Sequence, residues 1–157
     1  MLLFNGMNFT QWADMAIRIY TKDAMRRTGH RVVGTPHIFM GVLRDGPAAK
    51  LLIVDFNVSA GQTFAIVKKM PKPIRQGIGE PFLYTDGAKA VLEEARALAA
   101  DYVFSRGLIY TEYLLVALLN VGDESFLALL DKLGVDRELL FQHATESLEL
   151  KGKLVHQ

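Results

Sequence analysis

Apolar residues recur at helical spacing along most of the chain. After Thr10, alanine, isoleucine and tyrosine side chains follow at i, i+3 and i+4 intervals to position 24. This pattern predicts a helix with Thr10 as its N-cap, ending at Gly29. A second helix is predicted from Thr35, as N-cap, to about Arg44, with Pro36 at its first position, where a missing N–H is tolerated.

The pattern continues through two shorter helices and then breaks. A helix is expected over residues 47–54, and Ser59 with Gln62 has the spacing of a capping box that opens a fourth helix, ending near Met70. Residues 71–81 contain three prolines and two glycines, which neither continue a helix nor form a central strand. This stretch is predicted to be a linker.

After the linker the pattern begins again. Residues 9–17 (FTQWADMAI) match 84–92 (YTDGAKAVL), 34–43 (GTPHIFMGVL) match 110–119 (YTEYLLVALL), and 56–64 (FNVSAGQTF) match 133–141 (LGVDRELLF), at offsets of 75, 76 and 77. Such a period indicates an internal duplication. Because each unit is too small to enclose a large core, we predict an all-α fold, with two pseudo-symmetric four-helix repeats packed into one eight-helix globular domain.

The duplication also sets the expected boundaries. They are a leader at 1–8, a first repeat at 9–70, a linker at 71–83, a second repeat at 84–150 and a tail at 151–157. Met7 is a second candidate start, which makes the first six residues a disordered leader.

The second helix of the first repeat is apolar on nearly every side. Its apolar residues are Ile38, Phe39, Met40, Val42 and Leu43. A helix of this kind is a central one. We expect Gly41 to let a neighbouring helix approach closely, and Ala117, its counterpart, to be small for the same reason. His37, near the start of this helix, is expected to be half-buried and hydrogen-bonded to a carbonyl.

The composition argues against catalysis. Half of the residues are hydrophobic and none is cysteine, which excludes thiolate metal sites and thiol catalysis and fits a reducing cytoplasm. No apolar run reaches about 18 residues, so no membrane partner is expected. The chain has no phosphate-binding loop and no His-Glu-x-x-His motif. A Ser–His–Asp set stays open, without a nucleophile-elbow context. We predict no enzyme activity, no metal, no cofactor and a cytoplasmic location.

The charge is unevenly divided although the net charge is only +1. Residues 1–83 carry 11 Lys/Arg and 5 Asp/Glu, whereas residues 84–157 carry 7 and 12. This division indicates either two differently charged solvated surfaces or two unlike faces presented to a partner or to each other.

Basic residues gather in two places on the first half of the chain. They are Arg18, Lys22, Arg26 and Arg27 on the first helix, and Lys68, Lys69, Lys72 and Arg75 near the linker. Such groups contact phosphates, so a nucleic-acid-binding helical domain is the alternative function. It is the less favoured one, because no helix pattern for reading base edges accompanies these residues.

The duplicated signature resembles the N-terminal domain of the Clp-type AAA+ unfoldases, closest to the ClpC and ClpA kind. Its residues are Phe9-Thr10, Gly29-His30, residues 34–43 and Asn57-Val58 in the first repeat, and Tyr84-Thr85, residues 110–115 and 133–135 in the second. The resemblance covers about residues 9–150. It implies a non-catalytic module that recruits adaptors or client polypeptides to the Clp ATPase and ClpP machinery. The chain is then either a fragment of an unfoldase or a free-standing adaptor or regulator.

The resemblance also implies two kinds of site. In the ClpC branch, a Gly-Thr-Glu-His motif at the start of the second helix of each repeat binds phosphoarginine, because free N–H groups and the helix dipole favour the phosphate. The matching positions are Thr35, Pro36 and His37 in the first repeat and Thr111, Glu112 and Tyr113 in the second. Only the second keeps the glutamate, so any phosphoarginine binding is expected there, although an ordinary first-turn acid is the favoured interpretation of Glu112. The other site is a hydrophobic groove between the repeats, with Phe82, Leu83 and Tyr84 as candidates.

Overall fold

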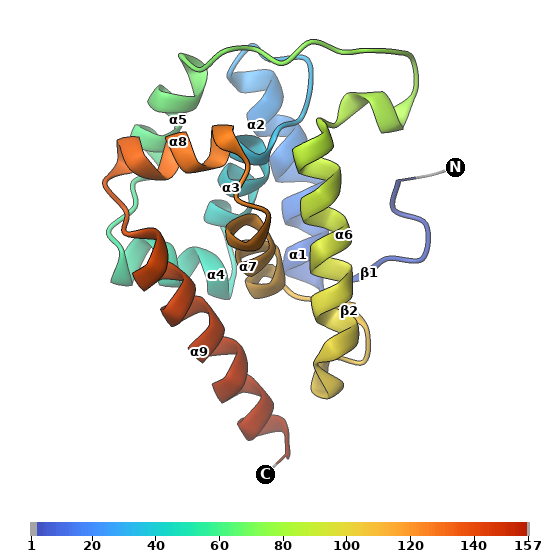
Figure 1. The fold of residues 1–157 in the computed structure, drawn as a ribbon, viewed down its shortest axis with the longest axis vertical. Helices are drawn as coiled ribbons and strands as arrows, with labels where there is room; N and C mark the ends of the chain where they lie inside the picture. The colour runs from blue at the N-terminus through green and yellow to red at the C-terminus, as the bar shows by residue number, and fades with distance from the viewer. Residues whose placement is uncertain (1–2, 157) are drawn as a thin grey trace.

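Helical segments in two groups of four make up the fold (Figure 1). The structure, a computed structural model, describes residues 3–156, with the side chains of residues 3–150. The first group comprises α1 (Gln11–Met15), the π-helical η1 (Ala16–Tyr20) and α2 (Thr21–Arg27) as one continuous helix, then α3 (Thr35–Arg44), α4 (Pro47–Lys50) with the π-helical η2 (Leu51–Asp55), and α5 (Ala60–Lys68). The second comprises α6 (Asp86–Asp101), α7 (Thr111–Val121), α8 (Glu124–Leu133) and α9 (Arg137–His156). The predicted all-α fold is confirmed.

Side-chain caps fix several of the helix starts. Thr10 Oγ1 accepts a hydrogen bond from the backbone N–H of Ala13 at 3.4 Å, and Ser59 Oγ accepts one from Gln62 at 3.2 Å. Both predicted caps are therefore confirmed. The first helix ends at Arg27, and Gly29 follows with a φ of +80°, a conformation that glycine adopts without strain.

Two short strand pairs join the repeats. Strand β1 (Asn8–Phe9) runs parallel to β2 (Leu108–Ile109), and a single bridge links Val33 to Tyr84. The repeat offset carries Phe9 onto Tyr84 and Val33 onto Ile109. The two pairings are therefore the same contact seen from either repeat. In both pairings, the segment before the first helix of one repeat pairs with the segment before the second helix of the other repeat.

Helices α3 and α7 lie at the centre of the molecule (Figure 1). Eight residues of α3 and nine of α7 are buried, as the apolar sequence predicts. A Cβ built on Gly41 would overlap Thr21 Oγ1 and lie 2.7 Å from the carbonyl oxygen of Ala16. The expected close approach at Gly41 is confirmed: the first helix crosses α3 there. Ala117, its counterpart in α7, is fully buried.

The segments at the two ends of the predicted repeats take part in the described structure. Phe4 packs edge to face against Phe9 and Tyr84, and Met7 is buried. Leu3 and Phe4, within the predicted leader, thus pack against the core. At the other end α9 continues through position 150 into the predicted tail, residues 151–157, whose side chains lie outside the described residues.

The predicted linker contains no α-helix over its described length. Residues 71–79 form no helix, and a 3₁₀ turn, η3 (Glu80–Leu83), precedes the bridge at Tyr84. Arg75 holds the linker's shape by donating from its guanidinium to the carbonyl oxygens of Gly77 and Gly79. A second 3₁₀ turn, η4 (Val103–Ser105), connects α6 to β2.

Candidate functional site

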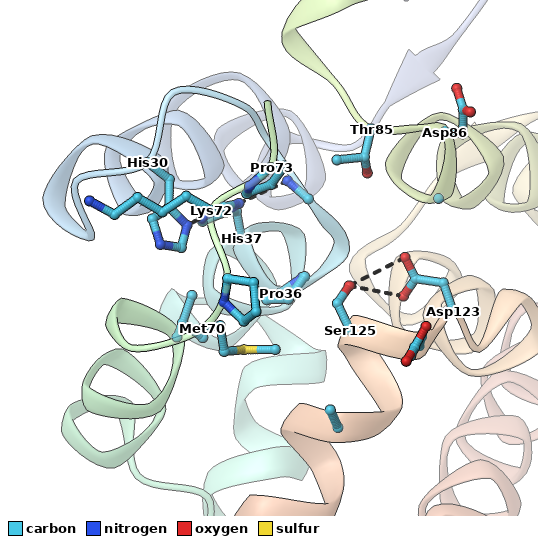
Figure 2. A pocket seen from close by; sticks show the side chains of 16 residues that line it. His30, Pro36, His37, Met70, Lys72, Pro73, Thr85, Asp86, Asp123 and Ser125 are labelled. Atoms are coloured by element: carbon cyan, nitrogen blue, oxygen red, sulfur yellow. Dashed lines mark hydrogen bonds between the residues drawn. The ribbon is translucent and has the colours of Figure 1, made fainter. Parts of the chain in front are cut away.

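A cavity of about 670 Å³ lies where three helices begin. The first residues of α3, α6 and α8 border it, and the end of α5 and the start of the linker complete the wall. Figure 2 shows His30, His37 and Lys72 on one side, Asp123 and Ser125 on the other, and Pro36 between them. Hereafter we call this space the three-helix cavity.

The start of α3 is built differently from the prediction. Gly34, not Thr35, is the N-cap residue, and Pro36 is the second helical residue. The backbone N–H of Gly34 donates to His37 Nδ1 at 2.8 Å, so His37 has the part that a glutamate or glutamine has in a capping box. Thr35 does not cap because its hydroxyl donates elsewhere, to Asp123 Oδ1 at 2.6 Å.

That second bond ties α3 to α8. Asp123 is the N-cap of α8: its Oδ1 also accepts from the backbone N–H of Phe126 at 3.1 Å. Ser125 Oγ lies 3.2 Å from Thr35 Oγ1 and donates to the Asp123 carboxylate. One carboxylate thus satisfies a buried hydroxyl and a helix N-terminus at once, and it fixes the acidic side of the three-helix cavity.

Two buried histidines form the opposite side. Because His37 Nδ1 accepts from Gly34, the ring proton is on Nε2, which donates to His30 Nδ1 at 2.8 Å. Burial, with a smaller contribution from His30, lowers the pKa of His37 to about 3. Burial and the Lys72 ammonium lower the pKa of His30. The pair is neutral near pH 7. The expectation of a half-buried His37 bonded to a carbonyl is wrong: its ring is buried and bonds to a backbone N–H and a second ring.

The lining is apolar in the middle and charged at the rim. The apolar lining residues are Pro36, Val67, Met70, Pro71, Pro73 and Ala128. Lys72, Asp86 and Glu124 are exposed at the edge. The cavity thus has an apolar floor with cationic and anionic groups at opposite ends, a lining that fits an extended peptide better than a single ion.

The corresponding place in the second repeat is closed. Thr111, Glu112 and Tyr113 are only 1, 3 and 0% exposed, and Thr111 Oγ1 donates to the Glu112 carboxylate at 3.1 Å. Trp12 packs against Gly46, which also borders Thr111. The repeat offset places Trp12 opposite Gly87, a residue that lines the three-helix cavity. The repeats therefore differ at this position: a half-exposed tryptophan lies beside Gly46 in one, and a glycine lines the open cavity in the other.

The two candidate sites therefore differ in accessibility. The sequence favours Thr111 and Glu112 because the glutamate is kept, but the structure buries them. Pro36 and His37, at the position where the acid is missing, line an open cavity.

The three residues predicted to line a hydrophobic groove differ in how far they are buried. Phe82 is 45% exposed and lies under the Lys89 ammonium, Leu83 packs against the core, and Tyr84 is buried. Phe82 and Tyr84 border a smaller cavity of about 260 Å³, which shares Thr85 with the three-helix cavity. Burial raises the pKa of the Tyr84 hydroxyl.

Sequence reasoning missed the contribution of α8. Asp123 and Ser125 come from the third helix of the second repeat, which no motif singles out. The available signal was local: an aspartate three residues before the buried Phe126 is typical of an N-cap. Within the described part of the chain, no three His, Asp or Glu residues are placed to hold a metal ion.

No family model matches the chain. The curated relatives and the solved structures, however, agree on the kind of protein it resembles. It is 33% identical over 134 residues to the ATP-dependent Clp protease ATP-binding subunit ClpA homolog of Cyanidium caldarium, 33% over 135 residues to the negative regulator of genetic competence ClpC/MecB of Bacillus subtilis, and 31% over 140 residues to the chaperone protein ClpB of Oceanobacillus iheyensis. These matches cover 82, 81 and 81% of the chain but only 15% of each relative.

Solved structures show the same fold. The N-terminal domain of the chaperone ClpD from Arabidopsis thaliana superposes with a TM-score of 0.73 at 21% identity, over 94% of this chain and 97% of that one. The Hsp104 N-terminal domain from Candida albicans gives 0.66 at 16% identity, over 88 and 90%.

The duplicated four-helix architecture with a cavity at its helix starts defines a class of small all-α domains. Within that class, the chain belongs to the Clp N-terminal domains. No single helix among the described residues is long and apolar enough to cross a membrane; two bent helix pairs meet that test only when their lengths and compositions are combined.

Proposed function

We propose that the chain is a non-catalytic binding module of a Clp unfoldase–protease system, and that the three-helix cavity receives a segment of a client or adaptor polypeptide. The observation that carries this proposal is an open, largely apolar cavity of about 670 Å³ with charged groups at its rim. Its volume is within the range of about 300–1,000 Å³ typical of ligand sites. The proposal keeps the cytoplasmic location expected from the sequence.

The relatives support the kind of partner. They are named as an ATP-binding subunit of the Clp protease, a negative regulator of genetic competence and a chaperone, and the chain spans about 15% of their length. The Clp ATPase and ClpP machinery and its client polypeptides are therefore the partners we propose. Both a fragment of an unfoldase and a free-standing adaptor fit this role.

A cavity-filling substitution tests the proposal. A fluorescently labelled, chemically unfolded model polypeptide should bind the wild-type chain saturably. Ala128→Trp should weaken binding at least about tenfold, since a tryptophan at this lining position fills the space an apolar client side chain needs. Ala65→Trp, on the exposed face of α5, is the matched control and should leave binding unchanged.

The measurement is fluorescence anisotropy, with a thermal melt of each variant to check folding. An equal loss in both variants, or the absence of binding to the folded wild type, would reject the cavity as the site.

A further inference from the structure

A third, still smaller hollow lies on the outside of the first repeat, away from the three-helix cavity. Tyr20, Met40, Leu43 and Phe64 form its apolar walls, between α2, α3 and the start of α5, and its volume is about 190 Å³. Arg27 and Arg44 stand at its mouth. We call it the arginine-flanked slot. Its volume is below the usual size of a small-molecule site and suits a single side chain.

Aromatic rings hold both arginines in place. The Arg27 guanidinium lies 5.2 Å from the centre of the Phe64 ring, and that of Arg44 lies 4.9 Å from the Tyr20 ring. Each is about half exposed. The guanidiniums are thus positioned on the two walls before any ligand arrives, which lowers the entropy lost on binding.

The charge around the slot is only partly balanced. Asp23 pairs with both arginines, at 4.0 Å from Arg27 and 3.1 Å from Arg44. The Lys68 ammonium lies 5.9 Å from the Phe64 ring and adds a third cation. A neighbouring cleft shares Tyr20 and Arg44 with the slot and carries further basic residues. They are Arg18, Lys22 and Arg26. Asp14 pairs with Arg18 and Glu80 pairs with Lys22, so Asp23 is the carboxylate that faces Arg27, Arg44 and the nearby Lys68.

The second repeat differs at the matching place. The repeat offset puts Arg137 and Glu138 where the first repeat has Ala60 and Gly61, both of which border the slot. Arg137 reaches back to donate to the carbonyl oxygen of Leu119, at the end of α7. Two small residues at the start of α5 thus border the slot where the second repeat carries two long charged side chains.

We propose that the arginine-flanked slot binds an acidic polypeptide segment whose single large apolar side chain enters between Tyr20 and Phe64. The apolar walls recognise the side chain, and Arg27 and Arg44 pair with carboxylates on either side of it. This surface is separate from the three-helix cavity, so the inference stands or falls independently of the proposed function.

Peptide binding tests the inference directly. A short synthetic peptide with one leucine between glutamates should bind the full chain, measured by fluorescence anisotropy at low salt. The double variant Arg27→Glu/Arg44→Glu should weaken binding at least about tenfold, because it removes two charge pairs and adds repulsion. Lys50→Glu, an exposed charge reversal outside the slot, should not. Ala128→Trp should also leave this binding unchanged.

A charge-neutral variant separates shape from electrostatics. Ala60→Arg/Gly61→Glu gives the first repeat the residues of the second, so it should abolish binding without changing net charge. A peptide with serine in place of leucine should bind at least about tenfold more weakly. Equal binding of the two peptides overturns the proposal. So does preferential binding of single-stranded nucleic acid, or self-association abolished by the slot variants without peptide binding.

Discussion

At the scale of single residues, small side chains decide where helices meet and where space remains. Gly41 sits under the first helix, with Thr21 Oγ1 and the carbonyl of Ala16 in the space that a Cβ would need. Thr21 itself donates to that carbonyl at 2.7 Å, within the π-helical stretch η1. Neither neighbour is the free end of a flexible side chain, so the contact cannot relax cheaply.

Gly41→Ala should therefore destabilise the fold. We expect the free energy of unfolding to fall by about 1–3 kcal/mol, the usual effect of overpacking a core. The measurement is urea denaturation followed by circular dichroism. Gly61→Ala is the control, because its Cβ would meet only Ser59 Oγ, at 3.8 Å, and should be neutral or slightly stabilising. Equal stability of Gly41→Ala and wild type would show that the crossing is looser than described.

The buried histidine pair makes stability depend on pH. Folded His37 stays neutral down to a pKa of about 3, whereas an unfolded histidine titrates near 6.5. Between these values the unfolded state binds more protons, so stability falls as pH is lowered. His37 alone should lower the free energy of unfolding by about 2 kcal/mol between pH 7 and pH 5.

Denaturant titrations at a series of pH values measure this slope. His37→Gln removes the titrating group and should flatten the dependence between pH 7 and pH 5. His143→Gln, outside the pair, should keep the wild-type slope. The assignment fails if His37→Gln and wild type lose stability in parallel.

At the scale of elements, the starts of the helices were the easiest features to predict. Thr10 and Ser59 cap where their spacing indicates, because a cap is a contact within one turn of the chain. The start of α3 was misassigned by one residue because Asp123, 88 positions away, takes the Thr35 hydroxyl. A local pattern carries no information about such a partner.

The Asp123 carboxylate accepts hydrogen bonds at the starts of both α3 and α8, so its loss should destabilise both helices. Asp123→Ala removes the cap of α8 and the acceptor of the nearly buried Thr35 hydroxyl, so it should destabilise by about 2–3 kcal/mol. Asp136→Ala removes only a cap, that of α9, and should destabilise by about 1 kcal/mol. Chemical denaturation of both variants decides, and equal losses would mean that the Thr35–Asp123 bond adds nothing.

At the scale of the whole molecule, the duplication was predictable and its asymmetry was not. The offsets of 75 to 77 residues between matching segments indicate two equivalent units. The equivalent positions carry different side chains: Trp12 lies beside Gly46, which borders the closed Thr111, whereas Gly87 lines the open cavity. That contact joins residues far apart in sequence, so periodicity did not reveal it.

Trp12→Ala should uncover the start of α7. If Trp12 is what blocks Thr111 and Glu112, the variant should bind a phosphoarginine peptide more tightly than the wild type, by about tenfold or more, because the helix N-terminus becomes accessible. Isothermal calorimetry measures this. Glu112→Ala in the same background should remove the gain. Equal heats for wild type and Trp12→Ala would show that burial by Trp12 is not the obstacle.

The two strand pairings between the repeats determine how the two halves of the chain associate. Phe9 with Ile109 and Val33 with Tyr84 are reciprocal contacts, the arrangement found in a twofold-symmetric dimer. The chain is therefore built as a dimer whose subunits have been fused, and residues 71–79 act as the tether that keeps their effective concentration high. A protease cut in that tether should leave two fragments that stay associated and, once separated, find each other again by complementation.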